Sequence, residues 1–83
     1  MDLTTKIRDY IVENFLFGDA EPLEDDQMSL LDNGIIDSTG VMELVAFLEA
    51  DFGLNVSDEE LVPENLDSVA SIAAFVQRKQ AAA

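Results

Sequence analysis

The architecture of this chain follows from residues 38–52, which read STGVMELVAFLEADF. The apolar side chains of this segment fall at helical spacing, and they are Val41, Leu44, Val45, Leu48 and Phe52. Residues at i, i+3, i+4, i+7 and i+11 form one stripe along a helix. Gly53 suits the left-handed position that closes many helices. The segment therefore predicts an amphipathic helix whose stripe packs into a core.

Similar stripes predict a helix on each side of this one. The first covers residues 3–16, with Asp2 as N-cap and Gly18 as the stop, and its stripe is Leu3, Ile7, Tyr10, Ile11 and Phe15. The last opens at Asp67 or Ser68 and ends near Lys79, and its stripe is Val69, Ile72, Ala73 and Val76. Residues 80–83 are expected to fray.

Two connections complete the predicted fold. Residues 17–37 are polar and acidic, and loops of this length tend to be functional. Leu30, Leu31, Ile35 and Ile36 should pin this loop to the core. Residues 57–66 have room for a short helix that begins at Pro63, since proline suits a first helical position. We predict an all-α four-helix bundle of three main helices plus a short third helix, with a long first loop, in a single domain of residues 1–83.

Charge restricts the partners of this chain. Its 83 residues include 4 Lys and Arg against 18 Asp and Glu, a net charge of -14. Nucleic acid and anionic membrane surfaces are therefore not expected as partners, whereas basic protein surfaces are. A simpler interpretation is that the acidic residues only maintain solubility. The chain has no basic leader and no apolar run long enough to span a membrane, so we expect a cytoplasmic protein.

Few residues could carry chemistry. The chain has no Cys and no His, so it lacks a thiol, a disulfide and the usual acid–base groups, and we expect neither an enzyme nor a metal site. Asp25 and Asp26 form a pair in a polar loop, where solvated charge is the simpler interpretation. What remains is the run GIIDSTG at residues 34–40, in which Ser38 occupies the expected N-cap of the central helix. Taken alone, Ser38 could serve only as that cap.

The runs SLLDNGIIDS at residues 29–38 and DEELVPENLDS at residues 58–68 resemble acyl and peptidyl carrier proteins. The resemblance implies that Ser38, preceded by Asp37, carries a 4′-phosphopantetheine arm transferred from coenzyme A by a phosphopantetheinyl transferase. The arm would hold acyl or aminoacyl groups as thioesters and supply the thiol that the chain lacks. The resemblance also implies a monomer that presents its cargo to a loading ligase and to downstream enzymes.

The outer face of the central helix is the expected docking surface for these enzymes. It comprises Thr39, Met42, Glu43, Ala46 and Glu49. In the family, acidic and small apolar residues of this helix bind basic patches on partners, with charge guiding the encounter. The alternative is an ordinary solvated face.

One difference from the fatty-acid carriers bears on the pathway in which this chain would work. Many of them have Leu-Asp after the attachment serine, whereas this chain has Thr39 and a flexible Gly40. General fatty-acid synthesis is therefore not the expected pathway. The runs IIDS at residues 35–38 and PEN at residues 63–65 resemble dedicated carriers that accept an acyl or aminoacyl group from an adenylating ligase. The competing hypothesis is an acidic helical adaptor that binds a basic partner without covalent cargo, and a small enzyme is a weaker one.

Overall fold

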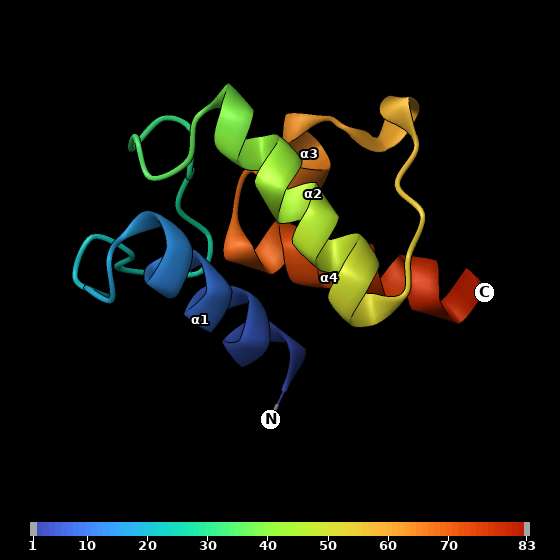
Figure 1. The fold of residues 1–83 in the computed structure, drawn as a ribbon, viewed down its shortest axis with the longest axis horizontal. Helices are drawn as coiled ribbons and strands as arrows, with labels where there is room; N and C mark the ends of the chain where they lie inside the picture. The colour runs from blue at the N-terminus through green and yellow to red at the C-terminus, as the bar shows by residue number, and fades with distance from the viewer. Residues whose placement is uncertain (1, 83) are drawn as a thin grey trace.

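The computed structural model describes residues 2–82 and shows an all-helical chain (Figure 1). No strand occurs within these residues. Its elements are α1 (Leu3–Phe15), α2 (Ser38–Phe52), the 3-10 helix η1 (Asp58–Glu60), α3 (Pro63–Leu66) and α4 (Val69–Ala82). The predicted bundle of three main helices and a short third helix is confirmed, and Pro63 opens α3 as expected.

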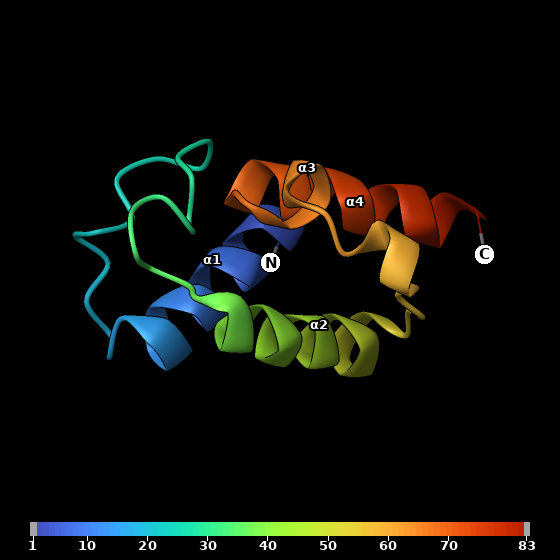
Figure 2. The same cartoon turned by 90° about the horizontal axis from the view of Figure 1, so that it is seen from above.

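The three long helices lie side by side around one core (Figures 1 and 2). α1 and α2 run in opposite directions, so that the end of α1 lies beside the start of α2 in both views. α4 packs against α1 and runs in the same general direction as α2. The short α3 packs against α4.

The core is built from the predicted stripes. The fully buried side chains of α1, α2 and α4 are Ile7, Ile11, Leu44, Leu48, Val69, Ile72 and Val76. Val41 and Phe52, at the two ends of the α2 stripe, are only half-buried. Phe75 on α4, outside the predicted stripe, is also buried, so the apolar face of α4 is wider than four residues.

Most helix caps are the residues that the sequence predicted. The Asp2 carboxylate accepts the Thr5 N–H at 2.8 Å, and Gly53 closes α2 in the left-handed conformation with φ 67°. At the start of α4 the cap is Ser68, whose hydroxyl oxygen accepts the Ser71 N–H at 3.0 Å. α4 continues through Ala82, where fraying was expected, because alanine and glutamine favour helix.

Asp67 has another function, which is to hold the long first loop. Its carboxylate accepts the Ser29 hydroxyl at 2.6 Å and the Leu31 N–H at 2.9 Å, and its carbonyl accepts the Leu30 N–H at 2.7 Å. Leu23 and Leu30 of the loop are buried in the core. The loop is therefore fixed by both apolar burial and hydrogen bonds. Leu30, Ile35 and Ile36 are buried as predicted, whereas the Leu31 side chain is 39% exposed.

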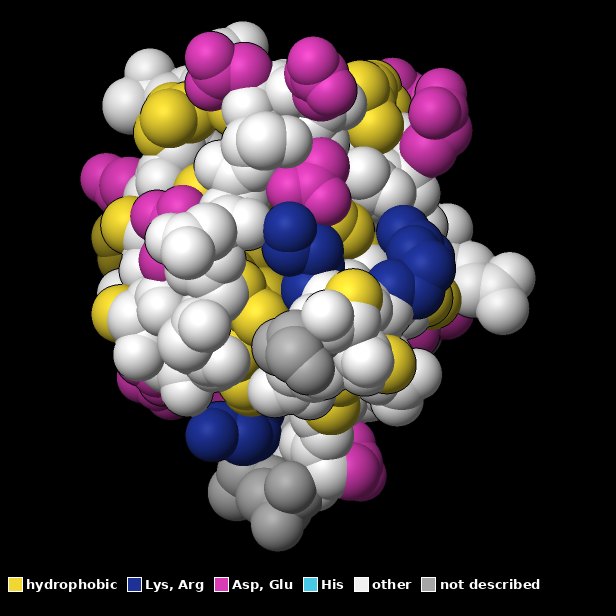
Figure 3. All heavy atoms as spheres, turned by 90° about the vertical axis from the view of Figure 1, so that its right-hand side faces the viewer, with side chains coloured by type: hydrophobic (Ala, Val, Ile, Leu, Met, Phe, Trp, Pro, Cys, Tyr) yellow, Lys and Arg dark blue, Asp and Glu magenta, His cyan; other side chains and the backbone are white. Residues whose placement is uncertain are grey.

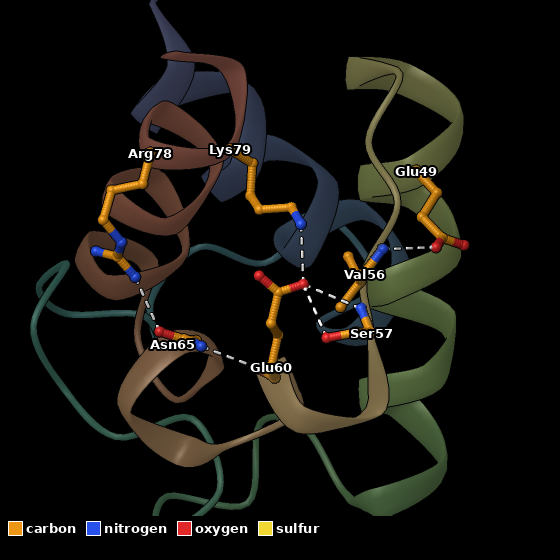
Figure 4. Close-up of polar contacts among 7 residues, drawn as sticks. All are labelled: Glu49, Val56, Ser57, Glu60, Asn65, Arg78 and Lys79. Atoms are coloured by element: carbon orange, nitrogen blue, oxygen red, sulfur yellow. Dashed lines mark hydrogen bonds and ion pairs between the residues drawn. The ribbon is translucent and has the colours of Figure 1, made fainter. Parts of the chain in front are cut away.

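Glu60 connects η1 to the last turns of α4 (Figure 4). Its carboxylate accepts the Ser57 N–H at 3.0 Å and pairs with the Lys79 ammonium at 2.9 Å. Asn65 is the neighbouring link, because it accepts from the Arg78 guanidinium and donates to the Glu60 carbonyl. The Ser57 N–H, followed by Lys79, holds the pKa of Glu60 below its ordinary value of 4.5.

We expect Glu60 to stabilise the fold in a pH-dependent manner. Because its pKa is lower in the folded chain, its contribution is present above 4.5 and is lost as the pH falls through the folded value. Glu60→Gln should therefore unfold at lower urea than wild type at pH 7, and the difference should shrink at pH 3. Glu59→Gln, at an exposed neighbour, is the control. A constant difference across this range would contradict the prediction.

Candidate functional site at the start of α2

Ser38 is the first residue of α2, and the cap of this helix is Asp37. The Asp37 carboxylate accepts the Gly40 N–H at 2.7 Å. The prediction that Ser38 itself is the N-cap is therefore wrong, because Asp37 already satisfies that amide. Ser38 is exposed, and its hydroxyl is not required to cap the helix. This leaves the hydroxyl accessible to an enzyme.

Gly40 allows α1 to approach the first turn of α2. It is buried, and a Cβ built on it would lie 2.8 Å from Phe15 Cε1 and 3.2 Å from Ile36 Cγ2. No real Cβ atom tolerates the shorter distance without a shift of the ring. The interpretation of Gly40 as a flexible residue is therefore corrected. The sequence places a glycine near a helix start but does not reveal that the Phe15 ring lies over it.

We expect Gly40→Ala to destabilise the fold. Alanine in an open helix gains roughly 1 kcal/mol over glycine, but overpacking costs typically about 1–3 kcal/mol. A net loss of up to about 2 kcal/mol should appear in urea unfolding. The double variant Phe15→Leu/Gly40→Ala should recover part of it, and Ala46→Gly on the exposed face reports helix propensity alone. A gain in stability from Gly40→Ala would show that the ring does not restrict this position.

An apolar hollow opens beside Ser38, between α2 and α3. Its volume is about 210 Å³, and it is lined by Leu31, Ser38, Val41, Leu61, Val62, Pro63 and Leu66. Drug-sized ligands occupy pockets of roughly 300–1,000 Å³, so this hollow suits a short group only. The first two amides of α2 have no intrahelical partner, and such amides favour a phosphate. The exposed hydroxyl, the free amides and the hollow together fit a phosphodiester-linked arm at this position.

The predicted docking surface is mostly exposed. Met42 is 57% exposed, and Thr39, Glu43 and Ala46 are exposed as well. Glu49 differs, because it is half-buried and its carboxylate accepts the Val56 N–H at 3.0 Å (Figure 4). Glu49 therefore holds the segment that follows α2. The Glu43 carboxylate makes no hydrogen bond or ion pair within residues 2–82, so of the two carboxylates on this surface it is the one available to a partner.

An aromatic contact that the sequence did not predict joins α1 to α2. The Tyr10 and Phe47 rings stack with centroids 3.9 Å apart, and the Tyr10 hydroxyl donates to the Glu43 carbonyl at 3.2 Å. Burial, followed by the charges of Glu43 and Asp51, raises the pKa of Tyr10. Phe47 lies outside the α2 stripe, so helical periodicity alone did not identify it. The contact fixes the side of α2 that α1 covers.

Comparison with known proteins decides the family. The family model described as "Phosphopantetheine attachment site" matches residues 3–76, and thus covers all but the ends of the chain. The chain belongs to this family. It is similar to "Probable acyl carrier protein PigG" of Serratia sp. (strain ATCC 39006), with 34% identity over 95% of this chain and 90% of the relative. It is also similar to the "D-alanyl carrier protein" of Abiotrophia defectiva, with 32% identity over 71% of this chain and 75% of that relative.

The family match and the two relatives confirm the predicted carrier function. The protein is a carrier that holds acyl or aminoacyl intermediates on a 4′-phosphopantetheine arm, and carriers of this family do not themselves perform the chemistry. Such carriers work with phosphopantetheinyl transferases and with loading and downstream enzymes. No helix within residues 2–82 is long and apolar enough to cross a membrane, and no metal-binding cluster occurs among them.

Proposed function

We propose that Ser38 is the attachment site of the arm. The observation that carries this proposal is its position, because Ser38 is exposed, opens α2 and borders the apolar hollow. The other serines have structural partners, since Ser29 binds Asp67, Ser57 binds Glu60, and Ser68 binds Ser71. The arm supplies the thiol for a thioester. The chain then contributes one compact domain, acting as a monomer, that presents the loaded arm.

We expect Ser38→Ala to abolish modification and to leave the fold intact, because Asp37 caps the helix. Intact mass after incubation with a phosphopantetheinyl transferase and coenzyme A measures the gain of one phosphopantetheine. The thermal unfolding midpoint should stay close to that of wild type. Ser57→Ala, which removes another exposed hydroxyl, should be modified normally. A wild-type chain that gains no mass would favour the acidic adaptor, and modified Ser38→Ala would place the site elsewhere.

The charge distribution supports basic partners for the docking surface. Every Lys and Arg falls within residues 6–8 or 78–79, so residues 9–77 carry acidic residues without one basic side chain. Figure 3 views the side on which α4 ends and shows Lys and Arg side chains gathered there. Arg8 and Lys79 pair with Asp26 and Glu60. The α2 surface beside Ser38 is thus negative, and a basic patch on a loading enzyme complements it.

The cargo that this site favours is small. The hollow beside Ser38 has about 210 Å³, which suits a short acyl or aminoacyl group. One similar protein is a D-alanyl carrier protein, and a D-alanyl group is small enough to fit the hollow. Thr39 and Gly40 also differ from the Leu-Asp of many fatty-acid carriers. We therefore propose loading by an adenylating ligase that activates a small carboxylic or amino acid.

We expect Glu43→Lys to slow loading by raising KM, and the effect should shrink with added salt, because charge guides the encounter. Met42→Ala should also raise KM but with little salt dependence, since an apolar contact acts only on touching. Steady-state kinetics with the loading ligase, at low and moderate salt, measure both effects.

Asp9→Lys is the matched control for this experiment. Asp9 is exposed on α1 and lies near Asp51 in the last turn of α2, about 20 Å along that helix from Ser38. Equal impairment by Asp9→Lys and Glu43→Lys would show that only the net charge matters, and the docking surface on α2 would have to be abandoned.

A further inference from the structure

Phe17 projects into solvent in a backbone conformation that phenylalanine rarely adopts. Its side chain is 97% exposed, and its φ is 54°. It is the one residue other than glycine with a positive φ in residues 2–82. The left-handed conformation strains a side chain with a Cβ, and glycine normally occupies this position after a helix. Here the glycine follows one residue later, as Gly18.

The fold gains nothing visible from this ring. The core residues are buried without it, and the helix end is fixed by backbone hydrogen bonds, in which the Leu16 and Gly18 N–H groups both donate to the Val12 carbonyl. Single exposed apolar residues are common on protein surfaces. An aromatic ring that is both almost fully exposed and held in a strained conformation is not, and such outliers cluster at functional positions.

Phe17 lies on the same end of the molecule as Ser38. Phe15 packs over Gly40 in the first turn of α2, and two further residues of chain span at most about 7 Å. Figures 1 and 2 both place the end of α1 beside the start of α2. A standard interface buries about 800 Å² on each partner, a patch roughly 30 Å across. An enzyme that reaches the Ser38 hydroxyl directly therefore has an interface wide enough to include Phe17.

The partner that must approach in this way is the transferase, since it acts on the serine before any arm extends the reach. This enzyme binds the phosphates of coenzyme A, so its surface near the reacting serine is rich in Lys and Arg. The exposed charged residues within four positions of Phe17 in the sequence are Glu13, Asp19 and Glu21, all acidic. Their charge is opposite to that of the transferase surface.

We propose that Phe17 is an apolar anchor that inserts into a socket, bordered by basic residues, on the phosphopantetheinyl transferase. This inference rests on the proposed attachment at Ser38. It adds a contact on the loop after α1 to the surface of α2. The left-handed backbone at Phe17, held by the hydrogen bond from the Gly18 N–H to the Val12 carbonyl, keeps the ring exposed before the partner arrives, so little ordering is required on binding.

The test is the rate of modification of Phe17 variants by a purified transferase that modifies the wild-type chain. Burying a phenylalanine side chain corresponds to a change in affinity of about tenfold to one-hundredfold. Phe17→Gly should lower kcat/KM by this factor through KM, at low and high salt alike. Its thermal unfolding midpoint should equal or exceed that of wild type, because glycine relieves the strain.

Two further variants separate the effect of losing the aromatic ring from the effect of changing the loop backbone. Phe17→Asn tolerates the left-handed conformation without adding a second glycine, and it should lose as much kcat/KM as Phe17→Gly. Phe17→Trp keeps an aromatic ring and should retain most of the wild-type value. Prolonged incubation should still modify Ser38 fully in every variant, which separates this inference from the attachment itself. Unchanged kcat/KM in Phe17→Gly and Phe17→Asn, with wild type modified, would overturn the anchor and leave Ser38 as the site.

Discussion

The close packing of the Phe15 ring on Gly40 is the contact on which the proposed attachment site at Ser38 depends. It brings the end of α1 onto the first turn of α2, so close that a Cβ at position 40 would force the Phe15 ring to shift. The Asp37 carboxylate caps the same turn by accepting the Gly40 N–H. Together these contacts fix the orientation of the first residue of α2, so that the Ser38 hydroxyl faces solvent beside the hollow formed with α3.

A second constraint comes from two carboxylates that tie irregular segments to helices. Asp67, between α3 and α4, binds the end of the long first loop, and Glu60 binds the last turns of α4. Neither loop has a regular backbone ladder, so these carboxylates satisfy amides that would otherwise need water. They also locate Leu31 and Leu61, which both line the hollow. The shape of the site thus depends on polar contacts outside it.

Charge and apolar contact have different roles in recognition at the proposed docking surface beside Ser38. Because residues 9–77 have no basic side chain, the field around Ser38 is negative over a wide area, which favours basic partners without selecting among them. Selection requires groups that touch, and the exposed apolar side chains are Met42 on α2 and Phe17 in the loop that follows α1. A carrier that must meet several enzymes gains from this division, since each enzyme can use a different apolar contact under the same attraction.

The sequence by itself determined the helices, the glycine stop of α2, the proline start of α3 and the family resemblance around Ser38. These features follow from local rules, because periodicity, caps and turn residues act within a few positions of one another. The tertiary structure decided what depends on residues far apart in the chain. It showed that Gly40 is required by Phe15, that Asp67 holds the first loop while Ser68 caps α4, and that Glu49 binds Val56. Packing distances and hydrogen-bond partners across the fold are set by how the helices meet, and no local pattern records them.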